Sequence, residues 1–287
     1  MSALAALLPD RRLHLQHGPI DCVCRAWGAP DQIARAYAQA ADAFPSILPA
    51  LCEELPTLRA PLPSPVPRGP VAHAMHAACL PYAAGFITPM AAVAGAVADH
   101  VLAVMRNGTR LDRAFVNNGG DIAFHLSPGQ SLRCGLVGDL AAPALDAVIT
   151  LVAGQPARGV ATSGRACKDQ GGRSFSLGIA DAVTVLAMSA AQADAAATVI
   201  ANAVDLPGHP AVTRCPAVDI DPDSDLGDRL VTWQVAPLAP AEIATALDAG
   251  WEVAEGLRRA GLIAGAALLL GGQVRLAMST TFAGTIT

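Results

Sequence analysis

The sequence predicts an α+β fold in which alanine-rich helices pack on a layered sheet. Of the 287 residues, 53% are hydrophobic, but only 4% are aromatic. This composition supplies a core built mainly from small side chains. Helix-like segments are flanked by pairs of strand-like segments, which is typical of layered α+β proteins. We expect a single domain over residues 1–287, with a proline-rich connector at 59–70.

The first third of the chain predicts one strand and several helices. Alternating apolar residues predict a strand over Asp21–Trp27, and helical spacing predicts helices over Ile33–Phe44 and Ile47–Leu55. Residues 59–70 contain five prolines, which favour an extended connector. A helix over Val71–Leu80 follows the connector.

The middle of the chain predicts a capped helix, three strands and a second helical region. Thr88 and Pro89 precede a helical pattern, since threonine can cap and proline suits the first turn. The segments are a helix over Met90–Met105, strands over Ile122–Leu126, Asp146–Val152 and Val160–Ser163, and an alanine-rich helical region over Ile179–Ala203, either continuous or broken near Ala190–Ala191. An internal duplication would relate Met90–Met105 to Ile179–Ser189, because each is a small-residue segment with an internal aspartate, Asp99 and Asp181.

The C-terminal third predicts a strand, a helix and a hairpin. Leu230–Val235 has strand character, and a helix begins near Pro240. Ala264–Met278 contains two glycines at its centre, as a two-stranded hairpin would.

The net charge and the cysteine content indicate which ligands and which cellular location to expect. The net charge is −5 and the arginines are scattered, which disfavours nucleic-acid binding. The seven cysteines contain no CxxC pair, so we expect no disulfide framework and a cytoplasmic location. Cys22 and Cys24 would lie on one buried face of the first strand.

One apolar stretch is long enough to cross a bilayer. Ala77–Ala98 contains no charged residue, and the mean hydropathy of the chain is +0.41. The stretch also contains prolines and glycines and is mostly alanine, whereas membrane insertion depends on larger apolar residues. We therefore expect a buried strand-turn-helix and no membrane association.

The segment Val116–Ile122 is the strongest candidate for a ligand-binding turn. It ends an apolar run in two asparagines, two glycines and a carboxylate. Glycine can adopt positive φ and lets a ligand approach the main chain. The same pattern is also the commonest hairpin turn, so both interpretations remain open.

Two further segments carry polar groups at the ends of apolar elements. Asp181 is a lone acid in an apolar segment, and it is either a ligand for a hard cation such as Mg²⁺ or a residue stabilised at a helix end. Ala161–Arg165 offers two hydroxyls, a glycine and a guanidinium, which suit a phosphate group or a surface turn. His73 and His76 lack an acidic metal-ligand partner, and no GxSxG, GxGxxG or P-loop pattern occurs.

Three blocks of sequence together resemble the ApbE superfamily, best known for FAD:protein FMN transferases. The blocks are Thr88–Asp99, Val116–Ile122, and Ala161–Gly164 with Ala180–Ala182. The chain is most similar to a short branch of the superfamily that lacks a lipoprotein signal. The resemblance implies a T-fold-like layered sheet, a flavin nucleotide, FAD or FMN, and magnesium.

The resemblance also implies roles for individual residues. The nucleotide site would be lined by Asn117, Asn118, Gly119, Gly120, Asp121, Thr162, Ser163 and Gly164. In the family, magnesium is held by the aspartate of an Ala-Asp-Ala segment, a threonine four residues on, and a carbonyl of the first block. These ligands would here be Asp181, Thr184 and the carbonyl of Ala91, although Val185 occupies the position four residues on.

One part of the transferase pattern is missing. The transferases carry a histidine-isoleucine-x-aspartate-proline segment before the metal aspartate, and Arg165–Gly178 contains neither histidine nor proline. Two functions therefore remain open. The chain either binds a small-molecule nucleotide and transfers FMN to an acceptor protein or acts on the pyrophosphate, or it is a noncatalytic nucleotide-binding or assembly protein. The sequence does not determine the oligomeric state.

Overall fold

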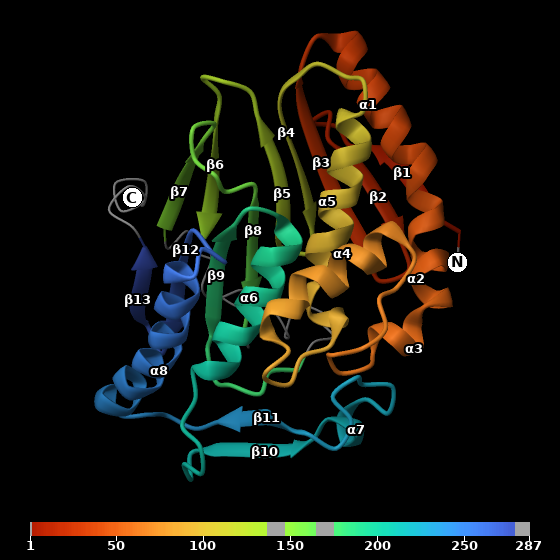
Figure 1. Ribbon diagram of the computed structural model, residues 1–287. Coiled ribbons are helices and arrows are strands. Elements are labelled where there is room, and N and C mark those ends of the chain that lie inside the picture. The colour runs from red at the N-terminus through yellow and green to blue at the C-terminus, as the bar shows by residue number, and fades with distance from the viewer. Residues whose placement is uncertain (1, 137–146, 165–174, 279–287) are drawn as a thin grey trace. The chain divides into compact units, whose positions relative to one another are not determined.

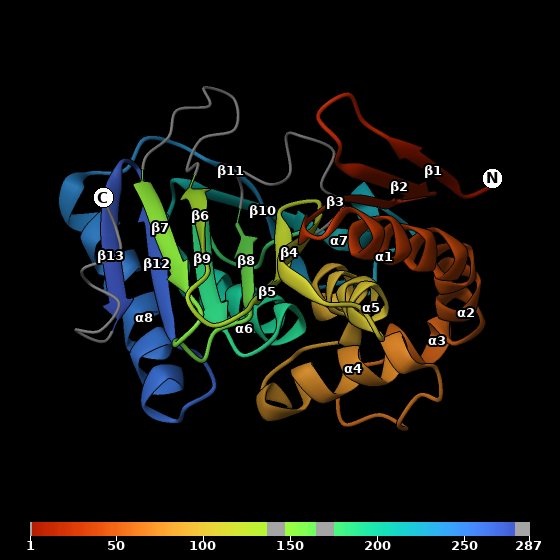
Figure 2. The same ribbon diagram turned by 90° about the horizontal axis from the view of Figure 1, so that it is seen from above.

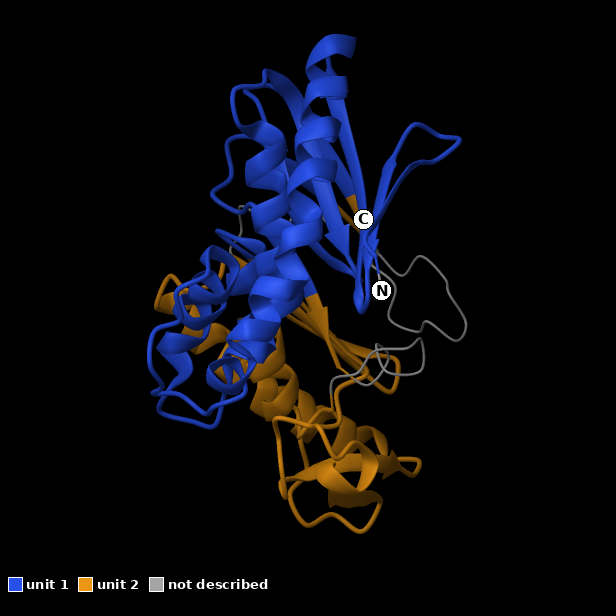
Figure 3. Cartoon of the chain, turned by 90° about the vertical axis from the view of Figure 1, so that its right-hand side faces the viewer, with its two compact units in different colours: residues 1–133, 150–161, 187–195 blue, residues 134–149, 162–186, 196–287 orange. Residues whose placement is uncertain are grey.

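A computed structural model describes residues 2–136, 147–164 and 175–278 of the chain. The chain divides into two compact units, each assembled from three segments (Figure 3). Unit 1 contains residues 1–133, 150–161 and 187–195, and unit 2 contains residues 134–149, 162–186 and 196–287. The expected single domain remains a prediction.

The elements follow the chain as labelled in Figure 1. The helices are α1 (Pro30–Ala43), η1 (Phe44–Ser46), α2 (Ile47–Glu53), α3 (Leu55–Leu58), α4 (Pro70–Cys79), η2 (Leu80–Tyr82), η3 (Pro89–Ala92), α5 (Val93–Arg106), α6 (Ala190–Ala203), α7 (Ala217–Ile220) and α8 (Pro240–Arg259). The strands are β1 (Leu4–Leu7), β2 (Leu13–His17), β3 (Ile20–Gly28), β4 (Leu111–Asn118), β5 (Asp121–Leu126), β6 (Ser131–Leu136), β7 (Ala147–Val152), β8 (Gly159–Ser163), β9 (Ala182–Ala187), β10 (Val212–Pro216), β11 (Leu230–Val235), β12 (Gly265–Leu270) and β13 (Gln273–Met278).

The sheet of unit 1 is antiparallel, with strand order β1-β2-β3-β4-β5-β8. Ile20, Cys22 and Cys24 on β3 are all buried, which confirms the predicted strand and its buried face. Alternation along a strand explains the pattern, because every second side chain faces the core. The β4–β5 hairpin closes with Asn118 paired to Asp121.

The helices of unit 1 cover one face of this sheet. Helix α5 packs on β4 and β5 and lies beside α1 and α4 (Figures 1 and 2). Its apolar residues include Val97, Val101 and Met105, all of which are buried. The predicted helices before and after residues 59–70 are confirmed, and residues 59–69 contain no helix or strand.

In unit 1, reciprocal hydrogen bonds link the N-terminal parts of α5 and α6. Asp99 on α5 accepts hydrogen bonds from the N–H groups of Ala190 and Ala191, at 3.0 and 2.9 Å. In return, Asp194 on α6 accepts a hydrogen bond from the N–H of Gly95 at 3.0 Å. Each carboxylate thus supplies partners that the first turn of the other helix lacks. A Cβ on Gly95 would lie 2.2 Å from the carbonyl oxygen of Ala190, so only glycine allows this approach.

Unit 2 contains an antiparallel sheet of β9-β12-β13 covered by a long helix. Helix α8 packs against β12 and β13 (Figure 2). Strands β10 and β11 form a separate two-stranded sheet. The predicted strand Leu230–Val235, helix near Pro240 and C-terminal hairpin are all confirmed.

One helix prediction is wrong. Ile179–Ser189 does not begin a helix, because Ala182–Ala187 forms β9 and the helix starts only at Ala190. All six residues of β9 are buried, so the segment shows no period-two alternation that would distinguish it from a buried helix. The suggested duplication of Met90–Met105 in Ile179–Ser189 therefore does not pair two helices, because Ala182–Ala187 is a strand.

Among the described residues, one helical stretch passes a length and hydropathy test for crossing a membrane. This stretch is Pro89–Arg106, and half of its best window is buried inside the protein. It includes α5, which packs on the sheet as a core helix does.

Candidate functional site

The turn between β4 and β5 presents an open backbone. Gly119 and Gly120 have φ values of 63° and 111°, in the region that favours glycine. No atom of the residues that the structure describes lies within 4 Å of a Cβ built on either glycine. The N–H of Gly120 donates to Oδ1 of Asn117 at 2.8 Å, which fixes the shape of the turn. A ligand can therefore reach the main chain here without displacing protein atoms.

The buried side chain of Asn118 anchors this turn to the rest of unit 1. Asn118 donates from Nδ2 to the carbonyl of Ala94 at 3.1 Å and accepts from the N–H of Asp21 at 3.3 Å. Asp121 is also buried, at the start of β5. The first two blocks of the sequence, around Ala94 and around Asn118, are thus brought together next to the start of α5.

The third block lies in unit 2 and brings together other predicted residues. The hydroxyls of Thr162 on β8 and Thr184 on β9 are 2.8 Å apart. A Cβ on Gly164 would lie 2.7 Å from the carbonyl oxygen of Asp181, so the two backbones touch. Ser163 is half-buried at the end of β8. A pocket shared by this block and the turn of unit 1 remains a prediction.

Asp181 and Thr184 have different partners. Oδ2 of Asp181 accepts the N–H of Gly271 at 2.7 Å, in the turn between β12 and β13. Thr184 lies three residues further on within β9, and residues three apart on an extended chain point to opposite faces. Ala91 lies in η3 of unit 1. Magnesium binding by Asp181, Thr184 and Ala91 remains a prediction that these contacts do not favour.

The segment after Gly164 lies outside the described residues, and with it Arg165, Cys167 and Lys168. The predicted role of the Arg165 guanidinium as a phosphate donor therefore stays a prediction.

The sequence interpretation missed a second Ala-Asp-Ala segment. Ala193-Asp194-Ala195 lies on α6, and Thr198 follows the aspartate by four residues on the same helix. This spacing matches the magnesium motif that the family resemblance implies, whereas Asp181 lacks a threonine at that spacing. This pattern is visible in the sequence, but the apolar segment after Asp181 resembles the start of a helix and therefore favours Asp181.

The carboxylate of Asp194 lies at the start of α5, where it accepts the backbone N–H of Gly95. Burial raises the pKa of its carboxyl well above the usual range, and the charge of nearby Asp99 acts in the same direction. No cationic side chain within the described residues pairs with Asp194. No cluster of three or more His, Cys, Asp or Glu that could hold a metal occurs in the part of the chain that the structure describes. A magnesium ion at Asp194 would need hydroxyl, carbonyl, phosphate or water oxygens beside that carboxylate.

A family model with the description "AbpE bacteria" matches residues 5–276 of this chain. The chain is also similar to curated archaeal proteins, each described only as a UPF0280 protein. It is 33% identical to that of Methanoregula boonei over 55% of this chain and 64% of the relative. It is 38% identical to that of Methanothermobacter thermautotrophicus over 42% of this chain and 44% of the relative. The matched region thus spans less than two thirds of these relatives.

Two solved structures resemble the chain distantly. One is a variant of the flavin transferase ApbE from Vibrio cholerae, with 12% identity and a TM-score of 0.42 over 96% of this chain and 99% of that one. The other is the ApbE protein of Thermotoga maritima, with 15% identity and a TM-score of 0.39 over 91% of this chain and 79% of that one.

Proposed function

Because the chain belongs to the AbpE bacteria family, we propose that it binds a flavin nucleotide, FAD or FMN, at the turn between β4 and β5. The observation that carries this proposal is the open backbone of Gly119 and Gly120, fixed next to the start of α5 by Asn118. The positions that match the nucleotide-lining motif of the ApbE superfamily are those of this turn, Asn117 to Asp121.

The turn suits the polar part of a nucleotide. Backbone N–H groups of a glycine turn can donate to phosphate oxygens because no Cβ keeps the ligand away. Asp121 can accept a hydrogen bond from a hydroxyl or ring N–H of the ligand. We include Thr162, Ser163 and Gly164 in the proposed nucleotide site on the basis of the family motif alone.

Magnesium fits Asp194 better than Asp181. The proposed protein ligands are the carboxylate of Asp194 and the hydroxyl of Thr198, with a carbonyl from the segment around Ala91. Magnesium would polarise the pyrophosphate of a dinucleotide. The protein side chains would orient that group and exclude water from it.

A second candidate function is nucleotide binding without catalysis, as a binding or assembly protein. It is favoured by one observation, the lack of histidine in the sequence between Arg165 and Gly178. In the catalytic alternative the partners are a small-molecule nucleotide and an acceptor protein that receives FMN.

Titration of the protein with FAD and FMN, followed by flavin fluorescence, tests the proposal. Gly120→Ala should weaken binding about tenfold or more, equivalent to about 1.4 kcal/mol, because the methyl group obstructs the open backbone. Gly129→Ala is the matched control, since Gly129 also has positive φ and no atom lies within 4 Å of a Cβ built on it. Equal affinities of the two variants, or no flavin binding by the wild type, would exclude this site.

The magnesium assignment is tested by the same titration with and without Mg²⁺. Thr198→Val should reduce the Mg²⁺-dependent gain in FAD affinity, while Thr184→Val should leave it unchanged. In the same way, Asp194→Asn should reduce the Mg²⁺-dependent gain, and Asp181→Asn should leave it unchanged. Loss of the gain in the Asp181 and Thr184 variants alone would instead support the site first inferred from the sequence.

A further inference from the structure

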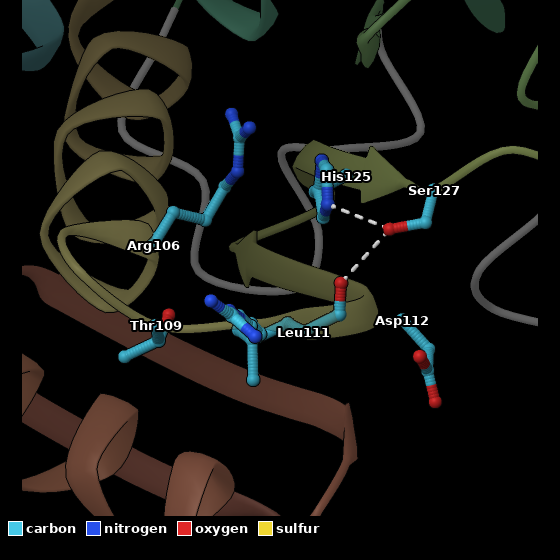
Figure 4. A pocket seen from close by; sticks show the side chains of 7 residues that line it. Arg106, Thr109, Leu111, Asp112, His125 and Ser127 are labelled. Atoms are coloured by element: carbon cyan, nitrogen blue, oxygen red, sulfur yellow. Dashed lines mark hydrogen bonds between the residues drawn. The ribbon is translucent and has the colours of Figure 1, made fainter.

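A pocket lies within unit 1, away from the glycine turn. Its volume is about 300 Å³, and its lining includes Arg106, Thr109, Arg110, Asp112, His125 and Ser127. The residues come from the end of α5, the start of β4 and the end of β5 (Figure 4). The glycine turn closes the opposite end of the β4–β5 hairpin. At about 3.3 Å per residue, the length of β4 separates the two places by roughly 20 Å.

The charges of the pocket are mostly positive and unpaired. Arg106 and Arg110 are exposed, and neither guanidinium forms a hydrogen bond or ion pair with any residue that the structure describes. Asp112 is the only acid in the lining, and it makes no ion pair with either arginine. Burial lowers the pKa of His125, and the charges of Arg106 and Arg158 lower it further.

The loop between Arg106 and Arg110 is held in place by α1. The side-chain amide of Gln39 donates to the carbonyl of Asn107 at 2.9 Å. Oε1 of Gln32 accepts the N–H of Arg110 at 2.9 Å. The backbone between α5 and β4 is thus held at Asn107 and at Arg110, while the guanidinium groups stay available to a ligand.

The opposite wall of the pocket is fixed by a short hydrogen-bond chain. Ser127 donates from its hydroxyl to the carbonyl of Leu111 at 3.0 Å and lies 3.4 Å from Nε2 of His125 (Figure 4). The hydroxyl of Thr109 donates to the carbonyl of Met105 at 2.8 Å. Both hydroxyl protons are therefore already used, which leaves the arginines as the main free donors.

The position of Arg106 has a simpler explanation, which does not extend to the whole pocket. A cation in the last turn of a helix interacts favourably with the helix dipole, and Arg106 ends α5. Arg110 lies beyond the helix, directly before β4, and gains nothing from that dipole. Two arginines without acidic partners beside one open pocket match an anion better than they match helix capping.

We propose that this pocket binds the phosphate group of a small molecule between Arg106 and Arg110. A guanidinium can donate two parallel hydrogen bonds to phosphate oxygens, and a volume near 300 Å³ is within the range of small-molecule sites. The site is separate from the proposed flavin site and does not depend on it.

Calorimetric titration with inorganic phosphate and with ribose 5-phosphate, at matched ionic strength in chloride, tests the proposal. The double variant Arg106→Gln, Arg110→Gln should bind the preferred ligand at least about tenfold more weakly, since two charge-assisted contacts are lost. Arg68→Gln removes an exposed arginine elsewhere in unit 1 and should bind like the wild type. Arg106→Lys, Arg110→Lys keeps the charge and should give an intermediate affinity.

The remaining outcomes separate the sources of the phosphate and the two sites. Equal affinity for both ligands supports free phosphate, and tighter binding of ribose 5-phosphate supports a phosphorylated metabolite. Binding that persists in the glutamine double variant and disappears in Gly120→Ala would overturn the proposal, because the phosphate would then lie at the glycine turn. No binding by the folded wild type would also overturn it, whether or not FAD binds.

Discussion

At the scale of single residues, Asp99 illustrates how buried carboxylates are satisfied in this protein. Its two oxygens accept the N–H groups of Ala190 and Ala191, and it lies inside α5 rather than at the end of its own helix. Burial raises the pKa of this carboxyl despite those hydrogen bonds. The residue thus acts as a cap for a helix that is distant in sequence.

Replacing Asp99 should destabilise the protein. Asp99→Ala leaves two N–H groups of α6 without partners and should lower the free energy of unfolding by about 1–2 kcal/mol. Asp99→Asn keeps an acceptor and should cost less. Urea denaturation measures the difference, with Asp42→Ala on the exposed side of α1 as control. A loss in the control as large as in Asp99→Ala would exclude a specific capping role.

Two helical glycines should respond oppositely to alanine. Gly95→Ala places a methyl group 2.2 Å from the carbonyl of Ala190 and should cost about 1–3 kcal/mol through overpacking. Gly256 in α8 has no atom within 4 Å of that position, so Gly256→Ala should stabilise the protein by about 0.5–1 kcal/mol. Thermal unfolding of both variants tests the pair. A stabilised Gly95→Ala would mean that α5 and α6 do not pack this closely.

His125 should make stability depend on pH. Burial and two arginines lower its pKa from the ordinary 6.5, so the unfolded chain binds the proton more tightly than the native protein. The free energy of unfolding should therefore fall as the pH drops below 6.5 toward the lower native pKa. His125→Gln should reduce this fall, as measured by denaturation at several pH values. An unchanged profile in the variant would assign the dependence to other groups.

At the scale of elements, position in the sheet sets local stability. Among the strands that the structure describes, β1 pairs only with β2, and it is exposed along its whole length. Strand β4 pairs with both β3 and β5 and has buried residues at alternate positions. A strand with one neighbour and no buried side chains can open without disturbing the core.

Hydrogen exchange should distinguish these two strands. Amides of Leu4–Leu7 should exchange much faster than those of Leu111–Asn118, because only the latter require opening of the core. Mass spectrometry of proteolytic fragments measures both. Equal protection of β1 and β4 would indicate that another chain covers the exposed strand in solution.

The sequence predicted the elements whose boundaries carry a chemical signal. Pro89 marks the start of the helical segment that becomes η3 and α5, and the two glycines near Gly271 mark the hairpin of β12 and β13. The sequence did not predict β9, because both faces of this strand are buried and its residues show no apolar-polar alternation. It did not predict β1 either, because every residue of β1 is exposed and alternation is again absent. The β-branched run Val183–Val185 was the remaining signal for a strand.

At the scale of the whole molecule, membership in the AbpE bacteria family confirms the resemblance inferred from the motifs, and the fold is the expected α+β, ApbE-like arrangement of sheets and helices. The glycine turn was predictable because glycines and asparagines have few alternative roles at a strand end. The choice of Asp194 over Asp181 as the proposed metal ligand was not predictable, because it depended on where α6 begins. The cationic pocket combines residues from three elements that no local pattern connects.

We expect the protein not to transfer FMN efficiently to a threonine-containing acceptor domain, even if it binds FAD. Activation of the acceptor hydroxyl by a general base contributes about 10²–10⁴-fold, and Arg165–Gly178 provides no histidine for it. Incubation with FAD, Mg²⁺ and the acceptor, followed by intact mass, detects covalent FMN. Robust Mg²⁺-dependent transfer would contradict this expectation and restore the catalytic alternative.

The mutual capping of α5 and α6 also has a consequence for synthesis on the ribosome. The partners of Asp99 follow it by 91 and 92 residues, and Asp194 follows Gly95 by 99. At about 5–20 residues per second, α5 is made roughly 5–20 s before its capping partner exists. During that interval, the core around α5 is incomplete, and the first turn of α5 lacks its capping carboxylate. Maturation of this helix must therefore follow translation of α6, so the nascent chain needs protection from aggregation for the whole of that delay.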